Sequence, residues 1–296
     1  MFKNKIFIAA FILLFILASI VFTNSLNYKL KKYLSMSKFN GAIGIAVAKD
    51  NKITTINNKK YPMLSIFKYF VAIKVLKDLE NKNIPLNQQL TVKKNMIDTN
   101  TYSPMLKKYT TYPIRISIAE LLKYMICESD NNACDILIEY TGGINQLEKF
   151  VHNIGFTNIE ISVNEKKMNR EIAAQYLNKS TPKDIILIMK YIKETNFLSK
   201  QHLIYLDTLM GQTTTGSNKL KAGLPSNITL YHKTGSGSRT PQGIKIADND
   251  AGYVVLSDGT VYYIAVMIKD SNMSDDDNAK IISTISNIIY KHYSKQ

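Results

Sequence analysis

The sequence predicts an α+β fold in which one antiparallel sheet, built from both ends of the chain, lies beside a domain of helices. Apolar residues follow a strand-like pattern near both ends of the 296-residue chain and a helical spacing in its middle. Terminal strands need partners, and a single sheet that joins both ends supplies them most simply. We therefore predict an α/β sheet domain from residues 26–58 and 211–296, an all-α domain from residues 59–210, and a ligand cleft between them.

The first 25 residues have the layout of a secretory signal. Lys3 and Lys5 precede an apolar run over residues 6–22, and small polar residues follow it up to Ser25. The run is long for a signal peptide and short for a membrane span, so an uncleaved membrane anchor is the alternative. We predict that residues 1–25 direct export to the periplasm.

The expected elements follow from the periodicity in chain order. Strand-like segments are 41–48, 52–57, 230–233, 251–256 and 261–268, with a hairpin turn at Asp258-Gly259 between the last two. Helical spacing covers residues 26–33, 66–79, 118–125, 133–140, 144–154, 183–193 and 279–293. Gly142-Gly143 is typical of a helix end, and Thr181-Pro182 of a helix start.

Composition excludes several classes of function. The formal charge is +15, but the lysines are spread along the chain without a basic block, which indicates a solvated surface and no nucleic-acid site. The four histidines are scattered and no C-x-x-C occurs, so we expect neither a metal nor any other cofactor. Cys127 and Cys134 are expected to be free, buried thiols, although their spacing also permits a disulfide.

The string Ser65-Ile66-Phe67-Lys68 is the first candidate for chemistry. Residues three apart share one helix face, so the Lys68 ammonium would lie beside the Ser65 hydroxyl. A lysine that loses its solvation there could act as a base, and the helix start would supply N–H groups to an oxyanion. The S-x-x-K pattern is weak alone, because it recurs at residues 35–38 and 180–183 and a serine at this place is also a common helix cap.

Two further strings follow in order. Ser129 begins an S-D-N string at 129–131, which is either a turn with a helix cap or a proton carrier facing Ser65. The K-T-G string at 233–235 ends a strand, where Lys233 and Thr234 could clamp a substrate carboxylate and Gly235 would let a ligand approach the strand edge. Each string occurs once, and their conjunction predicts acylation of a serine.

At these residues the sequence resembles the class A serine β-lactamases, and the resemblance covers nearly all of the chain after residue 25. It includes Tyr102-Ser103-Pro104 at the cleft wall, Gly142-Gly143, the stretch 213–225, and Ala251-Gly252 on a late strand. It implies an enzyme that acylates Ser65 with a β-lactam and hydrolyses the product, without a cofactor. The resemblance also implies a monomer that requires no partner protein.

The resemblance assigns the remaining site residues. Residues 163–169 match the family's E-x-x-[LM]-N loop, so Glu165 would activate the deacylating water and Asn169 would help to hold it. Asn131 would bind the acylamide side chain, and the backbone N–H groups of Ser65 and Ser236 would hold the oxyanion. Lys219 stands where the cephalosporinase-type branch of the family tends to carry an arginine that assists carboxylate binding; a lysine is a point charge and cannot form the same fork.

The sequence departs from the family around the Glu165 loop. Val163 and Asn178 replace the usual arginine and aspartate that brace the loop, and Asn164 replaces the usual aromatic residue. We therefore expect this loop to be held differently, as in the cephalosporinase-type branch.

Three other functions are compatible with parts of the pattern. A low-molecular-weight D,D-peptidase shares the acylation residues but needs no Glu165, and its acyl-enzyme is long-lived. A non-enzymatic penicilloyl sensor would need a signalling membrane domain. A basic nucleic-acid binder is the most distant alternative.

Overall fold

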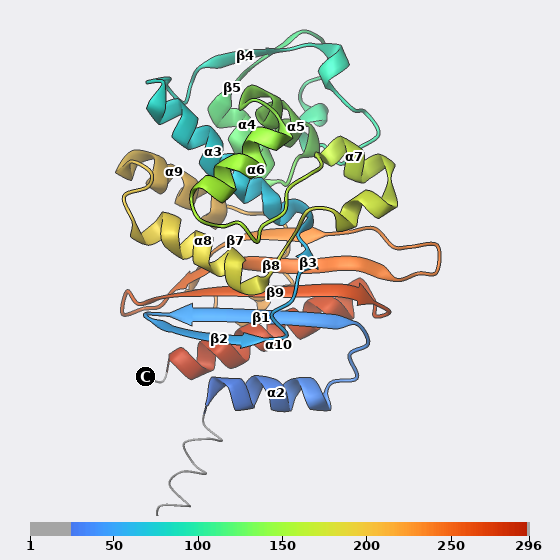
Figure 1. Cartoon of the computed structure of the whole chain (residues 1–296), viewed down its shortest axis with the longest axis vertical. Helices are drawn as coiled ribbons and strands as arrows, with labels where there is room; N and C mark the ends of the chain where they lie inside the picture. The colour runs from blue at the N-terminus through green and yellow to red at the C-terminus, as the bar shows by residue number, and fades with distance from the viewer. Residues whose placement is uncertain (1–24, 295–296) are drawn as a thin grey trace, which may run out of the picture.

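The computed structural model describes residues 25–294 and contains a five-stranded antiparallel sheet drawn from both ends of the chain (Figure 1). The strand order is β2-β1-β9-β8-β7. The strands are β1 (Ala42–Lys49), β2 (Lys52–Ile56), β7 (Thr229–Ser236), β8 (Lys245–Val255) and β9 (Val261–Ser271). The predicted fold class, with a sheet that joins the two ends, is confirmed.

The centre of the sheet is where the N-terminal and C-terminal parts of the chain meet. β1 pairs with β9 from Ala42↔Lys269 to Lys49↔Tyr262, and both strands are almost wholly buried. Their apolar residues belong to two cores, one on each face of the sheet, because successive side chains of a strand point to opposite faces. The predicted turn at Asp258-Gly259 joins β8 to β9, and Gly259 has the positive φ of 84° that such a turn requires.

Helices cover both faces of the sheet. α2 (Leu26–Met36) and α10 (Asp275–Tyr293) lie on one face, where Leu30, Ile264 and Ile285 belong to a shared core. α8 (Pro182–Glu194) contacts β1 and β9 from the other face, and the remaining helices lie beyond it (Figure 1). Ser25 caps α2, and the rest of the predicted export signal lies outside the described residues.

The helical part is centred on α3 (Lys68–Asn81), whose first nine residues are all buried. Around it are α4 (Ile118–Cys127), α5 (Asn131–Tyr140), α6 (Ile144–Asn153), α7 (Glu165–Arg170) and α9 (Lys200–Gly211). Single 3-10 turns occur at Leu64–Phe67, Lys94–Met96, Pro104–Lys107, Ile172–Tyr176 and Leu220–Gly223. α7 and α9 are absent from the sequence prediction, because α7 is a polar stretch of only six residues and the apolar residues of α9 lack a clear helical period.

The helical part of residues 59–210 also contains two short pairs of strands that the sequence prediction did not include. β4 (Gln89–Val92) pairs with β5 (Ile114–Ser117), and β3 (Tyr61–Pro62) pairs with β6 (Lys179–Ser180). These strands have two to four residues, too few for a period of two to be recognised in a sequence. The helix start at Thr181-Pro182 is confirmed, since Thr181 caps α8.

Within residues 25–294, no helix combines the length and the apolar character that crossing a bilayer requires.

Candidate active site

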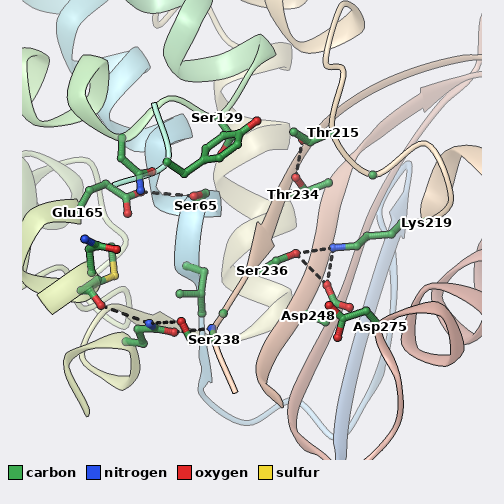
Figure 2. Close-up of a pocket in the computed structure, with 18 of the residues that line it drawn as sticks. Ser65, Ser129, Glu165, Thr215, Lys219, Thr234, Ser236, Ser238, Asp248 and Asp275 are labelled. Atoms are coloured by element: carbon green, nitrogen blue, oxygen red, sulfur yellow. Dashed lines mark hydrogen bonds and ion pairs between the residues drawn. The ribbon is translucent and has the colours of Figure 1, made fainter. Parts of the chain in front are cut away.

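A pocket of about 510 Å³ lies between the helical part and the edge strand β7, and the predicted site residues line it (Figure 2). The predicted residues on its wall are Ser65, Tyr102, Ser129, Asn131, Glu165, Asn169, Lys219, Thr234 and Ser236. Lys68 and Lys233 are completely buried behind this wall. Residues up to 171 positions apart in the sequence, from 65 to 236, therefore meet around one cavity.

Ser65 lies in the 3-10 turn Leu64–Phe67, one turn before α3 begins at Lys68. The alternative that Ser65 is a helix cap is wrong, because no side-chain cap bond exists at either start and the capping positions are Met63 and Phe67. Leu64 has a φ of 47°, a conformation that costs a non-glycine residue roughly 1–2 kcal/mol. This strained turn presents the Ser65 hydroxyl to the pocket.

Lys68 is held by acceptors from three elements. Its ammonium lies 3.0 Å from Glu165 Oε1 and donates to the Ser129 carbonyl oxygen and to Asn131 Oδ1, both at 2.6 Å. Among the contacts of the described residues, Ser65 donates to Glu165 Oε1 at 3.3 Å and not to Lys68. Glu165 is thus the group that joins Ser65 to Lys68.

Ser129 lies between the two buried lysines. Its hydroxyl accepts from Lys233 Nζ at 2.9 Å and is 3.4 Å from Lys68 Nζ. Burial, and then the neighbouring Lys68 charge, lowers the pKa of Lys233 well below its usual value. Ser129 itself has a φ of 60°, and this left-handed turn aims its side chain at the lysines.

Asp130 fixes the S-D-N turn to the cleft wall. Its carboxylate caps α5 at the Ala133 N–H and also accepts from the Ser103 hydroxyl and the Met105 N–H, each at 2.8 Å. The prediction of a helix cap in this string is confirmed for Asp130. Tyr102, one residue before Ser103, is 58% exposed on the pocket wall, as predicted.

The K-T-G string lies against the Ser65 turn. A Cβ added to Gly235 would stand 2.2 Å from the Met63 carbonyl oxygen and 3.2 Å from the Ser65 nitrogen. A Cβ at Gly235 would thus meet the backbone of the Ser65 turn, and Gly235 does not line the pocket; its role in letting a ligand approach the strand edge stays a prediction. The close contact of Gly235 with this turn sets the Ser65 N–H beside the end of β7.

Thr234 and Lys219 line the side of the pocket that lies opposite Ser65 (Figure 2). The Thr234 hydroxyl shares a hydrogen bond with Thr215 at 2.7 Å. Lys219 is buried, donates to the Ser236 hydroxyl at 2.9 Å and forms a close ion pair with Asp248. Sequence reasoning missed Asp248, which balances the Lys219 charge; its pairing with Ser236 across β7 and β8 is visible only in the strand register.

Glu165 is the first residue of α7 and is buried, not solvated as most loop glutamates are. Asn164, the unusual residue before it, caps this helix by accepting from the Lys167 N–H at 3.1 Å. Asp135 of α5 accepts from the N–H groups of Glu165 and Lys166, both at 2.9 Å. Asp135 thereby positions the catalytic candidate, and sequence reasoning missed it because its partners are backbone atoms.

The loop around α7 is braced by amides. Asn178 accepts from the N–H of Val163 at 3.1 Å and donates to its carbonyl oxygen at 2.7 Å, where the family pattern has an ion pair. Gln175, also missed, exchanges two hydrogen bonds of 2.9 Å with Ser238 after β7. Asn169 donates to the Asn100 carbonyl oxygen at 3.0 Å and lines the pocket. Amide hydrogen bonds thus brace this loop; that they brace it as in the cephalosporinase-type branch stays a prediction.

Asp135 makes the stability of the chain depend on pH. Burial, and then the Glu165 charge, raises the pKa of Asp135 to about 7. An unfolded aspartate loses its proton near pH 3.9, so the folded chain binds more protons between about pH 4 and pH 7, and stability falls as the pH rises. The Asp135→Asn variant has no titrating proton at this position. Between about pH 4 and pH 7, the free energy of unfolding of the wild type should therefore fall, relative to that of the variant, by about 1.4 kcal/mol per pH unit.

Urea unfolding of the wild type and Asp135→Asn at about pH 5 and about pH 7 measures this difference. Asp276→Asn makes the same chemical change at an exposed position of α10 and is the matched control. A wild-type-minus-variant difference that does not change with pH would show that Asp135 is ionised throughout.

The cysteines and the acidic groups suggest no other chemistry. Cys127 and Cys134 are free and buried, as predicted, and burial raises the pKa of Cys127 to about 11. Within the described part of the chain, no three His, Cys, Asp or Glu side chains are grouped as metal ligands would be.

The site brings together a strained serine turn, a buried carboxylate and two buried lysines. The serine hydroxyl donates to the carboxylate, and a second serine connects the lysines. Such a set can remove a proton from a nucleophile and return one to a leaving group.

Known proteins share this sequence pattern. Residues 25–293 match the model of the "Beta-lactamase enzyme family". A β-lactamase of Bacteroides uniformis is 38% identical over 268 residues, which is 90% of either chain. β-Lactamase VEB-1 of Pseudomonas aeruginosa is 33% identical, over 92% of this chain and 91% of its own.

Solved structures agree with the sequence comparison. A class A β-lactamase from Bacteroides cellulosilyticus superposes with a TM-score of 0.88 at 38% identity, over 92% of this chain and 99% of its own. The extended-spectrum β-lactamase TLA-1 gives a TM-score of 0.88 at 37% identity over the same shares. The chain therefore belongs to the β-lactamase enzyme family, and within it to the class A serine β-lactamases.

Proposed function

We propose that this chain hydrolyses the β-lactam amide of penicillins and cephalosporins through an acyl-enzyme on Ser65, and so confers β-lactam resistance. The observation that carries the proposal is the hydrogen bond from Ser65 to Glu165, which in turn pairs with the buried Lys68. Membership of the β-lactamase family supports the reaction class. The roles of the individual residues follow the family resemblance, and the geometry of this chain supports them.

In the acylation step, Ser65 Oγ attacks the lactam carbonyl. The hydroxyl proton passes to Glu165, which already accepts it at 3.3 Å, or to Lys68, which shares the same carboxylate oxygen. The N–H groups of Ser65 and Ser236 hold the oxyanion, supported by the close packing of β7 on the Ser65 turn. Ser129 then gives a proton to the ring nitrogen and is reprotonated through Lys68 or Lys233.

Substrate binding uses the two ends of the pocket. Lys233 and Thr234 are proposed to bind the substrate carboxylate. Lys219, which donates a hydrogen bond to Ser236, adds positive charge nearby. The Asp248 carboxylate offsets much of that charge, so Lys219 contributes less than an unpaired cation would. Asn131, Tyr102 and Asn169 line the other end, where the acylamide side chain is proposed to lie.

In the deacylation step, Glu165 takes a proton from a water that attacks the Ser65 ester. The acyl C–Oγ bond then breaks, Ser65 Oγ recovers a proton from Glu165 or Lys68, and the opened product leaves. Burial of the Glu165 carboxylate holds it at the pocket wall, as do the two hydrogen bonds that the backbone N–H groups of α7 donate to the Asp135 carboxylate. A carboxylate held in this way loses little conformational freedom when the transition state forms, and this lowers the activation free energy of deacylation. No step needs a metal or an organic cofactor.

Repeated turnover of a chromogenic cephalosporin tests this function against the peptidase and sensor alternatives. We expect the purified wild type to hydrolyse many equivalents, with a turnover number in the usual enzyme range of about 1–1,000 per second. Hydrolysis of one equivalent followed by a stable acyl-enzyme would establish the D,D-peptidase or sensor function instead.

The cellular location is a separate proposal. We propose export to the periplasm by residues 1–25, supported by the basic start and the apolar run of that segment, with an uncleaved anchor as the alternative. We also propose that the enzyme acts as a monomer, because all of the residues assigned above come from one chain. Sequencing of the N-terminus of the exported protein would reveal cleavage; a mature chain that keeps Lys3 would contradict it.

A further inference from the structure

The outer face of α2 carries an excess of positive charge. α2 contains Lys29, Lys31 and Lys32 and no acidic residue, and Lys31 and Lys32 are exposed. Lys291, in the last turn of the neighbouring α10, is also exposed. The acidic residues of α10 are in its first turn, about 24 Å away at 1.5 Å per residue, so they do not offset these charges.

A shallow apolar hollow lies among Lys29, Lys32 and Lys291, and Lys31 is outside its lining. It has a volume of about 410 Å³ and is formed by the facing sides of α2 and α10. Its walls are Lys29, Lys32, Tyr33, Met36, Ile288, Lys291 and His292. The Met36 side chain is 74% exposed, the most exposed of the large apolar residues in the described part of the chain. The face therefore combines a ring of cations with an uncovered apolar centre.

The position of this face leaves the active site free. α2 and the C-terminal end of α10 lie on one side of the sheet, whereas the active-site pocket is lined mainly by the helical part on the other side (Figure 1). The one α10 residue on the pocket wall, Asp275, is at the opposite end of that helix. α2 is also the first described element, and in the sequence it directly follows the apolar run of residues 6–22. A chain delivered to a membrane by that run would arrive with α2 nearest to the bilayer.

We propose that the basic face formed by α2 and the end of α10 docks on the surface of a phospholipid bilayer that contains anionic headgroups. Lys31, Lys32 and Lys291 pair with the headgroup phosphates, and the stems of the lysines and Met36 enter the interfacial region. A bilayer is favoured over another polyanion because an apolar centre among cations matches an interface and not a nucleic-acid backbone. Docking keeps the β-lactamase at the membrane while its pocket faces away.

A fluorescent probe at position 36 of the full-length chain tests this proposal. Met36→Cys allows an environment-sensitive dye to be attached, since Cys127 and Cys134 are buried. We expect vesicles of phosphatidylglycerol and phosphatidylcholine, but not of phosphatidylcholine alone, to shift the emission to the blue. The same dye introduced by Met96→Cys, in the helical part of the molecule, should not respond.

Charge variants test the lysines. Lys31→Glu, Lys32→Glu and Lys291→Glu together should raise the lipid concentration for half of the shift at least about tenfold. Lys82→Glu, Lys93→Glu and Lys94→Glu change three exposed lysines far from α2, give the same net charge, and should change that concentration less than about twofold. Hydrolysis of a chromogenic cephalosporin by both variants verifies folding.

Three results would overturn the proposal. No shift at position 36 on anionic vesicles would show that the face does not meet the bilayer, even if residues 6–22 bind it. An equal rise of the lipid concentration for half of the shift in both triple variants would show that binding depends on the net charge of the protein and not on this face. Binding of a DNA oligonucleotide that needs the same three lysines, without a shift on vesicles, would identify a nucleic-acid surface.

Discussion

Replacing Glu165 by glutamine should convert this enzyme from a turnover catalyst into one that accumulates its acyl-enzyme. The substitution keeps the size of the side chain but removes the carboxylate that is proposed to activate water and that pairs with Lys68 at 3.0 Å. We expect steady-state hydrolysis to fall about 10²–10⁴-fold, the usual contribution of a general base. Mass spectrometry should find Ser65 carrying a covalent substrate adduct after mixing.

Glu171→Gln is the matched control for this variant. Glu171 is exposed at the end of α7, six residues from Glu165, and its replacement makes the same change of charge in the same loop. We expect it to keep wild-type turnover. Wild-type turnover by Glu165→Gln would remove Glu165 from the deacylation step, and a variant that forms no adduct would assign proton removal from Ser65 to Glu165 alone.

Replacing Ser65 by alanine should abolish both acylation and hydrolysis. The pocket, the lysines and Glu165 remain, but no nucleophile is left to form the ester, so no adduct should appear in the mass spectrum. Loss of a serine nucleophile from a cooperating set costs on the order of 10⁶ in turnover. The absence of the adduct separates this variant from Glu165→Gln, which forms it and fails to release it.

Ser35→Ala is the matched control, since Ser35 begins another S-x-x-K string in the same chain. Its exposed hydroxyl donates to the Lys32 carbonyl oxygen on α2, far from the pocket. We expect full activity and a normal adduct on Ser65. An adduct that persists in Ser65→Ala would mean that another residue is the nucleophile.

The elements that were predicted well are those with long apolar periods or specific turn residues. β9 with the turn at Gly259, and α8 with its Thr181 cap, follow from patterns within ten or twenty residues. Of β8, only the second half was predicted. Other features of the site depend on distant neighbours. Gly235 has no side chain, and a Cβ added there would meet the carbonyl oxygen of Met63, which is 172 residues away in the sequence.

The supporting residues of the site were missed for a related reason. Asp135 acts on the backbone N–H groups of α7, Asp248 reaches Lys219 across the sheet, and Gln175 bonds Ser238 beyond the end of β7. The residue types that surround Asp135, Asp248 and Gln175 in the sequence do not indicate these partners. The signals that existed, Val163 and Asn178 in place of an ion pair, indicated that the loop was held differently but not by what.

The sequence alone determined the reaction class, because Ser65, Lys68, Ser129, Glu165 and Lys233 are chemical types in an order that few other functions require. Tertiary structure decided how those groups are connected. It joined Ser65 to Lys68 through Glu165, placed Ser129 between two buried lysines, and paired Lys219 with Asp248. Whether a hydrogen bond or ion pair forms depends on differences of a few tenths of an ångström in the distance between its two atoms. For residues far apart in the chain, only packing sets that distance.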